Sequence, residues 1–469
     1  MITLMTPLQM AALFYPHRTA IVSDGQRLTY RSFYQQARRL AGILMTDYGL
    51  RSKMTVGILC RNHLVSALLI PALSRLGVHV RLLNTDIPAV QMADLLDDHY
   101  RLLIYDEEVK DRCLPAEMPC PSVSAEVLAG RMTQQADSHY SFPILHNCAR
   151  ISVLTGGSSG SYTTASRRMG ALQYFSPFWA LLTDVHIHRY SSVLIALPFY
   201  HGFGLSALIV SLLLGKKICL HRHFDCNKVL STIQEENVEV LPVVPAMLSR
   251  LLQCQESESK LQSIKCILCG GDRLEKEVAD KTQKRLGQVL FNLYGTSEAG
   301  FLMLAKPADL VLENIIGRPI AGVKCGIRNP DNNGIGQLWV RSGWAMTSRK
   351  NQWQNTGDLV SRDEYGRYYH HGRTDRIVVC GGENVSLDHV EHIVCSHPSV
   401  YNAMAYSVAS EEFGQEVHAR VELHPETPSV SEKQLREWLY VRLSRAEMPH
   451  MITFGTITIL STGKRSREI

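Results

Sequence analysis

The sequence lacks a long apolar run, an ordered cysteine pattern and a strong charge imbalance. Its most apolar stretch, residues 203–214, is shorter than the roughly 20 residues that a membrane-spanning helix needs, so we expect no transmembrane segment. The 12 cysteines are scattered without a repeated spacing, which argues against a disulfide-stabilised secreted domain. Lys and Arg total 49 against 44 Asp and Glu, and a net charge of +5 over 469 residues indicates no nucleic-acid partner.

What is present is an ordinary globular composition. Hydrophobic residues make up 45% and charged residues 20%, which argues against long disordered segments. Residues 1–18 contain no basic segment followed by an apolar run, so we expect no secretory signal and predict a cytoplasmic protein. At about 150 residues per domain, the length suggests about three domains.

Short apolar runs alternate with helical patterns over most of the chain. The predicted strands lie at residues 55–60, 78–83, 192–197, 217–220, 238–244, 266–269 and 289–293. The predicted helices lie at residues 64–76, 205–214 and 245–253. Strands that alternate with helices in this way indicate parallel sheets built from βαβ units.

The pattern changes in the last third of the chain. Residues 317–340 are rich in Gly, Asn and short β runs, which is typical of a small barrel or meander, and a compact α+β pattern follows. Residues 372–376 offer few apolar side chains and mark a boundary between the two regions. We therefore predict an α/β fold. A large N-terminal domain, residues 1–373, would hold two βαβ-type sheets plus a small β-barrel, and a small mobile α+β domain would span residues 374–469.

The most informative segment is a Gly/Ser/Thr loop that follows an apolar strand at residues 151–154. Small residues let backbone N–H groups converge on an anion, and the hydroxyls add donors. Taken alone, such a segment is more often a flexible turn, and it lacks the GK[ST] ending of a Walker A loop. The loop consists of Thr155, Gly156, Gly157, Ser158, Ser159 and Gly160.

Four further motifs follow in order. Residues 293–298, Leu-Tyr-Gly-Thr-Ser-Glu, offer an aromatic ring, hydroxyls and a carboxylate after a strand. Residues 355–358, Asn-Thr-Gly-Asp, place a carboxylate in a turn, and residues 372–378 carry two arginines. Residues 461–467 place Lys464 close to the end of the chain. Each motif alone is more often a rim aromatic, a turn or a solvated lysine, but their order and spacing together are specific.

In this order the motifs resemble the adenylate-forming superfamily: acyl- and aryl-CoA synthetases, luciferases and the adenylation domains of peptide synthetases. The resemblance runs from Leu28 to Lys464, nearly the whole chain. It implies an AMP-forming acid–thiol ligase that converts a carboxylic acid and MgATP to an acyl-adenylate and pyrophosphate. The thiol of CoA, or of a carrier-protein phosphopantetheine, then takes the acyl group. Because the first step joins two anions, positioning and charge neutralisation should dominate.

The resemblance also implies where ATP binds. The loop at residues 155–160 would hold the β- and γ-phosphates. Tyr294 would stack on the adenine, and its opposite face would be covered by Gly270, Gly271 and Asp272.

Other residues would serve the reacting centre and the ribose. Ser297 would contact the α-phosphate, and Glu298 would hold Mg²⁺. Asp358, assisted by Arg373, would bind the ribose hydroxyls. Lys464 would bridge the substrate carboxylate and the α-phosphate, a place suited to a compact point charge.

Thioester formation needs a second geometry, which the resemblance assigns to the C-terminal domain. That domain would swing about a hinge at Asp375, so that Lys464 leaves the site. The loop of Gly381 and Gly382 would then enter and line the pantetheine channel, and glycine suits a surface that a thin chain must pass closely.

The phosphate loop departs from the family pattern. The loop usually ends in Gly-X-Pro-Lys, whereas here Thr163 occupies the lysine position. Arg167 and Arg168 follow shortly afterwards, either as solvated side chains or as a substitute for the missing charge. Since Lys464 and the other motifs are kept, we predict an active enzyme and retain a noncatalytic nucleotide- or acyl-binding relative as an alternative.

The acid pocket indicates an apolar substrate. His201 stands in a Pro-Phe-Tyr-His-Gly segment that resembles the acyl- and aryl-CoA ligase form, in which the histidine lies beside the carboxylate or gates the pocket. Residues 200–219 contain no aspartate to hold an amino-acid ammonium group. The predicted pocket neighbours Val244 and Phe301 are apolar and suit a fatty or aromatic acid. CoA is the predicted acceptor, and a carrier protein is the alternative.

Overall fold

The computed structural model describes residues 3–134, 140–142, 149–156, 162–168, 174–254, 257–380, 383–410, 414–424 and 430–457, without the side chains of residues 155, 156, 162–165, 167, 168 and 384. The chain forms two compact units. The first comprises residues 1–312, 319–324 and 341–352, and the second comprises residues 313–318, 325–340 and 353–469.

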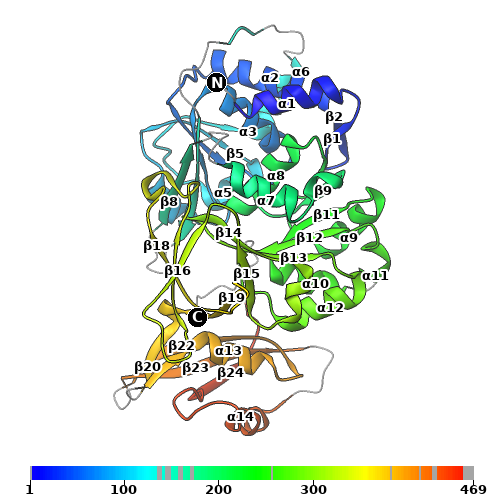
Figure 1. Ribbon diagram of the computed structural model, residues 1–469. Helices are drawn as coiled ribbons and strands as arrows, with labels where there is room; N and C mark the ends of the chain where they lie inside the picture. The colour runs from blue at the N-terminus through cyan, green and yellow to red at the C-terminus, as the bar shows by residue number, and fades with distance from the viewer. Residues whose placement is uncertain are drawn as a thin grey trace. The chain divides into compact units, whose positions relative to one another are not determined.

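The first unit contains a six-stranded sheet in the order β6-β5-β3-β4-β7-β8. Figure 1 labels β5 and β8 of this sheet. All neighbours are parallel except β7 and β8, which form an antiparallel hairpin. The strands are β3 (Thr55–Leu59), β4 (His79–Leu82), β5 (Tyr100–Tyr105), β6 (Ser122–Ser124), β7 (Arg150–Gly156) and β8 (Tyr162–Arg168). Their apolar runs are expected of parallel strands covered on both faces.

A second sheet of the same unit runs in the order β14-β13-β12-β11-β9-β10-β1-β2. Its central strands are parallel, and antiparallel pairs close both ends. The strands are β1 (Thr19–Ser23), β2 (Gln26–Thr29), β9 (Ser192–Ile195), β10 (Lys217–Leu220), β11 (Val240–Val243), β12 (Cys266–Gly270), β13 (Leu290–Thr296) and β14 (Gly300–Ala305). One apolar core joins side chains of both sheets, among them Val56 and Val193.

Helices pack against these sheets. They are α1 (Met5–Phe14), α2 (Tyr30–Thr46), α3 (Leu64–Leu76), α4 (Ala89–Leu95), α5 (Lys110–Cys113), α6 (Ala125–Gln134), α7 (Phe175–Thr183), α8 (Gly202–Leu213), α9 (Cys226–Glu235), α10 (Pro245–Gln253), α11 (Ser257–Lys260) and α12 (Lys276–Leu286). The sequence sets their ends locally. For example, Thr29 Oγ1 accepts from Ser32 N at 3.2 Å to begin α2, and Gly77 ends α3 with φ +69°.

The second unit consists of smaller sheets. Its antiparallel sheet runs in the order β16-β17-β18-β19-β15, followed by the hairpin β20-β21 and the sheet β22-β23-β24. The elements are β15 (Ile315–Pro319), β16 (Lys324–Arg328), β17 (Gly336–Arg341), β18 (Gln354–Arg362), β19 (Tyr368–Arg373), β20 (Ile377–Cys380), β21 (Glu383–Ser386), α13 (Leu387–Cys395), β22 (Val400–Ser410), β23 (Gly414–Leu423), α14 (Glu432–Tyr440) and β24 (Met451–Phe454). A separate apolar core lies between α13, α14 and the last sheet.

The predicted α/β fold is confirmed, with two large sheets and a smaller C-terminal α+β part. The predicted division at residues 373 and 374 concerns movement and stays a prediction, although the whole of residues 374–469 lies within the second unit. No helix in the described ranges is long and apolar enough to cross a membrane.

The cysteines whose positions the structure describes are free thiols. Cys266 and Cys269 form a CxxC sequence, but both are buried in β12. Burial raises the pKa of both thiols, that of Cys266 to about 12. This pair therefore provides neutral thiols of the core.

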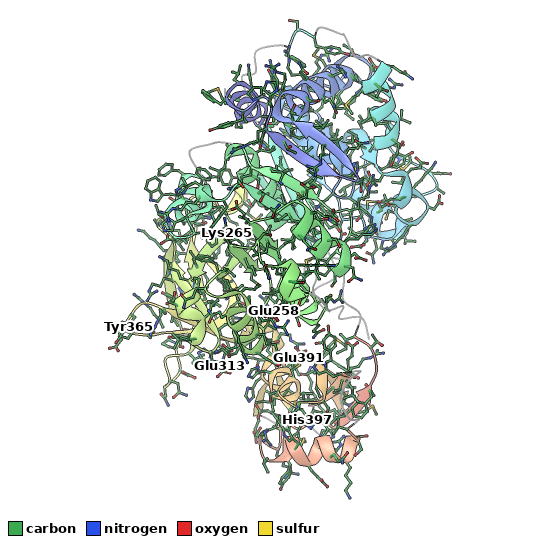
Figure 2. All side chains as sticks on the ribbon, turned by 90° about the vertical axis from the view of Figure 1, so that its right-hand side faces the viewer. Glu258, Lys265, Glu313, Tyr365, Glu391 and His397 are labelled. Atoms are coloured by element: carbon green, nitrogen blue, oxygen red, sulfur yellow. The ribbon has the colours of Figure 1, made fainter. Side chains whose placement is uncertain are left out.

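Glu239 gives the first unit a testable pH dependence. Burial would raise the pKa of its carboxyl, but hydrogen bonds from Lys265, which Figure 2 labels, and from Ser191 lower the pKa to about 2. Because the folded pKa is depressed, this stabilisation is complete above about pH 4.5 and is lost as the pH falls towards 2. We expect Glu239→Gln to lower the free energy of unfolding at pH 6, and the difference from wild type to shrink towards zero near pH 2.

Urea unfolding across this pH range measures the effect. Glu258→Gln, at an exposed carboxylate labelled in Figure 2, is the control and should show no such trend. A wild-type minus Glu239→Gln difference that is constant from pH 6 to pH 2 would contradict the assignment.

Candidate functional site

The Tyr294–Glu298 motif forms the tip of the β13–β14 hairpin. The prediction that the motif at residues 293–298 follows a strand is wrong for its first four residues, because β13 extends to Thr296 through antiparallel pairing with β14. Only Ser297 and Glu298 stand in the turn, where Ser297 is exposed and Glu298 half-buried. Thr296 Oγ1 accepts from Ala299 N at 3.0 Å and closes this turn.

Gly295 is required by a close approach of two backbones. A Cβ at this position would lie 2.3 Å from the carbonyl oxygen of Gly300 on the opposite strand. No L side chain fits there without separating β13 from β14. The glycine therefore fixes how tightly the hairpin closes behind Ser297 and Glu298.

A second segment holds the hairpin from outside. Met346 N donates to the Glu298 carbonyl oxygen at 2.7 Å. Ser342 Oγ donates to the Ala299 carbonyl oxygen at 2.9 Å, and Trp344 Nε1 donates to that of Phe301 at 3.0 Å. Ser342 and Trp344 are not predictable as part of the site, because no local pattern shows that they reach backbone groups 43 positions earlier in the chain.

The Gly270–Asp272 segment lies beside this hairpin. Gly270 pairs with Leu293 in the register of β12 and β13, next to Tyr294. A Cβ at Gly270 would lie 2.6 Å from the Leu293 carbonyl oxygen, and one at Gly271 would lie 3.5 Å from Val244 Cγ1. The structure thus brings together the predicted adenine segments and one predicted pocket residue. Phe301 joins them as the register partner of Gly295.

His201 stands where β9 leads into α8 and occupies the position before the first helical residue. The predicted helix at residues 205–214 begins earlier, at Gly202, because the His201 carbonyl accepts from Leu205 N at 3.0 Å. The imidazole is half-buried, and the Tyr200 ring meets it edge-on with centroids 4.7 Å apart. Gly204 lets the first turn of α8 pack closely against the backbone before it, since a Cβ there would lie 2.4 Å from the Leu197 carbonyl oxygen.

In the second unit, Asp358 and Arg373 face each other. They are register partners on β18 and β19, and Arg373 Nη1 lies 3.2 Å from Asp358 Oδ1. His370 Nε2 lies 3.4 Å from the same oxygen, and the Asp358 side chain is 7% exposed. The predicted assistance of Arg373 to Asp358 therefore has a geometric basis.

The prediction that Asp358 lies in a turn is wrong, because the residue belongs to β18. The turn-like sequence instead makes an irregularity within the strand. Gly357 has φ +82°, Asn355 Oδ1 accepts from Gly357 N at 2.9 Å, and the strand register shifts after Asp358. Asn-Thr-Gly, a sequence typical of turns, therefore forms a bulge within this strand.

The predicted hinge residue, Asp375, accepts two hydrogen bonds from Arg373, from Nε at 2.9 Å and from Nη2 at 3.1 Å. The neighbouring Arg376 is buried and ion-paired with Asp388 at 2.8 Å and with Glu391, which Figure 2 labels. Residues 372–376, which offer few apolar side chains, are therefore held by ion pairs. Charged groups of α13 hold this segment where apolar contacts do not.

The structure describes only part of the predicted phosphate loop. Thr155 and Gly156 end β7 and pair through their backbones with Thr163 and Tyr162 of β8. The predicted loop therefore joins two antiparallel strands. The following predicted residues lie outside the described part of the chain: Gly157, Ser158, Ser159, Gly160, Gly381, Gly382 and Lys464; the side chains of Arg167 and Arg168 do so too.

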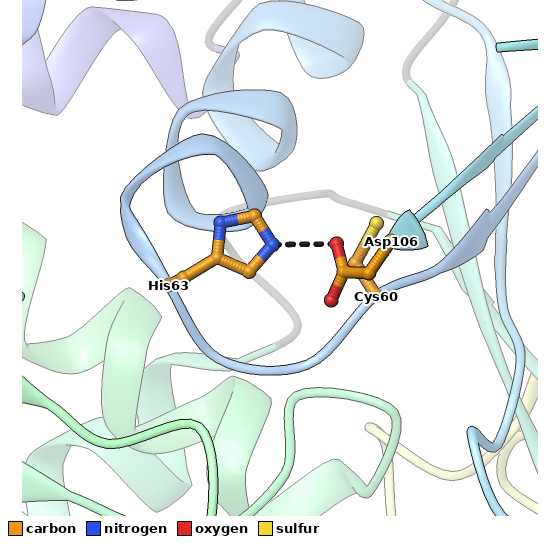
Figure 3. Close-up of side chains that lie close together, drawn as sticks. All are labelled: Cys60, His63 and Asp106. Carbon is orange, nitrogen blue, oxygen red and sulfur yellow. Dashed lines mark hydrogen bonds and ion pairs between the residues drawn. The ribbon is translucent and has the colours of Figure 1, made fainter. Parts of the chain in front are cut away.

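A further cluster, Cys60, His63 and Asp106, was missed (Figure 3). These residues follow β3 and β5, which are parallel neighbours in the six-stranded sheet. Polar side chains directly after adjacent parallel strands were the signal that could have found them.

The donor set suits a nucleotide and Mg²⁺. Glu298 supplies a carboxylate, and Thr296 and Ser297 add hydroxyls at the same hairpin tip. Such hard oxygen donors suit Mg²⁺, which is commonly held by one or two carboxylates together with phosphate oxygens. Beside them, Gly270 allows a close approach of β12 to β13.

Comparison with known proteins gives three findings. The family model described as "AMP-binding enzyme" matches residues 8–348. A 2-succinylbenzoate–CoA ligase from Bacillus licheniformis is 26% identical over 472 residues, covering 95% of this chain and 95% of the relative. The corresponding ligase of Bacillus subtilis is 25% identical over 462 residues, covering 94% of this chain and 92% of its own length.

Solved structures have the same fold. The o-succinylbenzoate CoA synthetase of Bacillus subtilis, in complex with the acyl-adenylate intermediate OSB-AMP, matches with a TM-score of 0.82 at 23% identity, covering 98% of this chain and 96% of that one. ATP-bound MatB from Rhodopseudomonas palustris matches with a TM-score of 0.83 at 20% identity, covering 98% and 97%.

Proposed function

The chain belongs to the AMP-binding enzyme family, and we propose that it is an ATP-dependent ligase joining an aromatic carboxylic acid to the thiol of CoA through an acyl-adenylate. Membership of the adenylate-forming superfamily, predicted from the motifs, is thereby confirmed. The observation that carries the proposal is a full-length match to enzymes named 2-succinylbenzoate–CoA ligase, at 95% coverage of both chains. We therefore take 2-succinylbenzoate as the first acid to test.

The reaction we propose has two steps. A carboxylate oxygen of the acid bonds to the α-phosphorus of ATP while the bond from that phosphorus to the β-phosphate oxygen breaks, which releases pyrophosphate. The CoA sulfur then bonds to the acyl carbon, the thiol loses its proton, and AMP leaves with the oxygen that joined it to the acyl group. Both steps bring anions together, so positioning and positive charge should contribute most of the rate enhancement.

In this proposal the β13–β14 hairpin and its neighbours bind the nucleotide. Tyr294 stacks on the adenine, with Gly270, Gly271 and Asp272 on the other side. Ser297 contacts the α-phosphate. The geometry that supports this is the register of Gly270 with Leu293, which places the two segments side by side.

Asp358 would bind the ribose hydroxyls, with Arg373 Nη1 orienting its carboxylate from 3.2 Å. Lys464 would bridge the carboxylate and the α-phosphate during the first step. We propose that residues 374–469 then move about Asp375, and that Gly381 and Gly382 line the channel for the CoA thiol.

The acid would lie near His201, with Val244 and Phe301 as apolar neighbours. Val244 is buried and close to Gly271, so acid and nucleotide positions adjoin in the first unit. An aromatic ring suits this lining better than a charged group would.

Glu298 is the proposed Mg²⁺ ligand, and the ion, when bound, would neutralise charge on the phosphates. We expect Glu298→Gln to raise the Mg²⁺ concentration for half-maximal pyrophosphate release about tenfold, because the amide keeps the size and loses the charge. Glu277→Gln, on exposed α12, is the control and should leave the Mg²⁺ dependence unchanged. An unchanged Mg²⁺ requirement in Glu298→Gln would contradict this role.

Product analysis tests the proposed function. Purified protein, ATP, Mg²⁺ and CoA would be incubated with 2-succinylbenzoate, benzoate and fatty acids of several lengths, and thioesters measured by mass spectrometry. We expect an aromatic acyl-CoA in largest yield. Supplying phosphopantetheinylated carrier protein in place of CoA tests the predicted alternative acceptor, and thioester on the carrier alone would overturn the choice of CoA.

A further inference from the structure

A buried turn after β3 is built around an ionised carboxylate. Asp106 Oδ1 lies 2.7 Å from His63 Nε2, and Asp106 Oδ2 accepts from Arg61 N at 2.8 Å (Figure 3 shows the first of these bonds). Asp106 is fully buried and His63 and Cys60 nearly so. The Cys60 thiol donates to the Ile104 carbonyl oxygen at 3.7 Å. We refer to Cys60, His63 and Asp106 as the brace.

The protonation of the brace follows from its contacts. Burial would raise the pKa of Asp106, but hydrogen bonds from His63 and from Arg61 N hold it below its usual value. Burial, reinforced by Asp106, raises the pKa of the Cys60 thiol well above its usual value. His63 Nδ1 accepts from Val65 N at 3.2 Å at the start of α3, which leaves its proton on Nε2, facing Asp106.

This geometry favours a hydrogen-bonded brace over a metal site. Two ligand atoms at about 2.1 Å from a tetrahedral zinc ion lie about 3.4 Å apart, which is wider than the His63–Asp106 contact. Both imidazole nitrogens of His63 already have partners. The Cys60 thiol also has a partner, because it donates to the Ile104 carbonyl oxygen.

The brace holds Asn62, whose side chain reaches the segment before His201. Asn62 Nδ2 donates to the Leu197 carbonyl oxygen at 2.7 Å, and Asn62 Oδ1 accepts from Phe199 N at 3.0 Å. Asn62 is 1% exposed, so these bonds are shielded from water. One amide therefore satisfies a buried carbonyl and a buried N–H that flank Pro198.

The same segment sets the position of His201. His201 N donates to the Pro198 carbonyl oxygen at 3.1 Å, so the turn fixed by Asn62 continues directly into the start of α8. Tyr200, which touches the His201 ring, is buried in this turn. A displacement of Leu197 or Phe199 would move the imidazole with the backbone.

We infer that Asn62, held by the Cys60–His63–Asp106 brace, is a positioning residue that sets the place of His201 at the acid-binding side of the site. The inference rests on the proposed function for the role of His201, but the placement of residues 197–201 by Asn62 is independent of it. Asn62 does not contact the reacting atoms. It acts through the backbone of residues 197–201.

Amide hydrogen exchange of the full chain tests the placement without relying on activity. We expect Asn62→Ala to speed exchange of peptides covering residues 197–205 about tenfold, with α10 unchanged. Asn62→Asp keeps the size of the side chain and the oxygen that accepts from Phe199 N. It replaces the alanine variant if that variant does not fold, and we expect it to speed exchange of residues 197–205 less. Asn402→Ala, at a buried asparagine of the second unit, is the control and should leave residues 197–205 unchanged.

Steady-state kinetics tests the consequence. We expect both Asn62 variants to raise KM for the acid about tenfold and to leave KM for MgATP within about twofold, a split that a general loss of folded enzyme does not produce. Asp106→Asn weakens the brace while keeping its shape. It should raise KM for the acid less than the Asn62 variants do and again leave KM for MgATP nearly unchanged.

Three results would overturn the inference: unchanged exchange at residues 197–205, equal effects on the KM of acid and of MgATP, or one zinc ion per chain that Cys60→Ser removes. If wild type activates no acid at all, the proposed function fails, and the exchange measurement still decides whether Asn62 places this segment.

Discussion

Replacing Lys464 with alanine is expected to slow acyl-adenylate formation by about a hundredfold to a thousandfold, the loss typical of removing one preorganised charge from a developing anionic centre. The lysine would bridge the acid carboxylate and the α-phosphate, two anions that otherwise repel each other. Because Thr163 stands where the family usually has a loop lysine, the proposed role of Lys464 should matter more in this chain.

The same variant should spare the second step. In the proposed alternation Lys464 has left the site before the thiol attacks, so transfer from chemically prepared acyl-adenylate to CoA should stay within about threefold of wild type. Both half-reactions can be followed separately by pyrophosphate release and thioester formation. Lys464→Arg is expected to restore little, since a forked guanidinium does not replace a compact charge.

Arg467→Ala provides the control, because it removes a charge from the same terminal segment. It should change neither half-reaction by more than about threefold. Equal damage to both half-reactions in Lys464→Ala would contradict the assigned role and with it the proposed movement about Asp375.

The second large effect is expected at Gly295. Gly295→Ala would place a Cβ 2.3 Å from the Gly300 carbonyl oxygen, a backbone atom that cannot move without opening the β13–β14 hairpin. Overpacking of this kind typically costs about 1–3 kcal/mol of stability. The displacement should also move Ser297 and Glu298, so we expect pyrophosphate release to fall at least about a hundredfold.

Thermal unfolding and circular dichroism should show that Gly295→Ala is largely folded at the assay temperature. Gly130→Ala is the matched control: its Cβ meets nothing within 4 Å, and it lies within α6. That variant should be as stable as wild type or more stable, with unchanged activity. A Gly295→Ala enzyme with wild-type kinetics would contradict the proposed role of the hairpin.

The sequence predicts the fold well because its apolar runs are local. The strand at 55–60 and the helix at 64–76 appear within one residue of β3 and α3, since apolar runs and the glycine after α3 define them. The start of α8 was predicted late because its first residues include two glycines, which weaken a helical pattern.

The site is predicted less completely, because several of the contacts that shape it join residues far apart in the sequence. The Tyr294–Glu298 motif is visible in the sequence, but the bonds from Ser342 and Trp344 that hold it depend on chain folding. Asn62 likewise reaches a segment some 135 positions away. Asp358 shows the opposite case: the local sequence indicates a turn, and strand pairing makes it a bulge.

Acid-dependent exchange of labelled pyrophosphate into ATP tests the central claim most directly. It detects reversible acyl-adenylate formation without CoA, so it separates an active ligase from a nucleotide-binding relative despite the altered phosphate loop. We predict exchange that depends on Mg²⁺ and on an aromatic acid such as 2-succinylbenzoate. ATP binding without exchange for any acid in the panel would contradict the proposed activity.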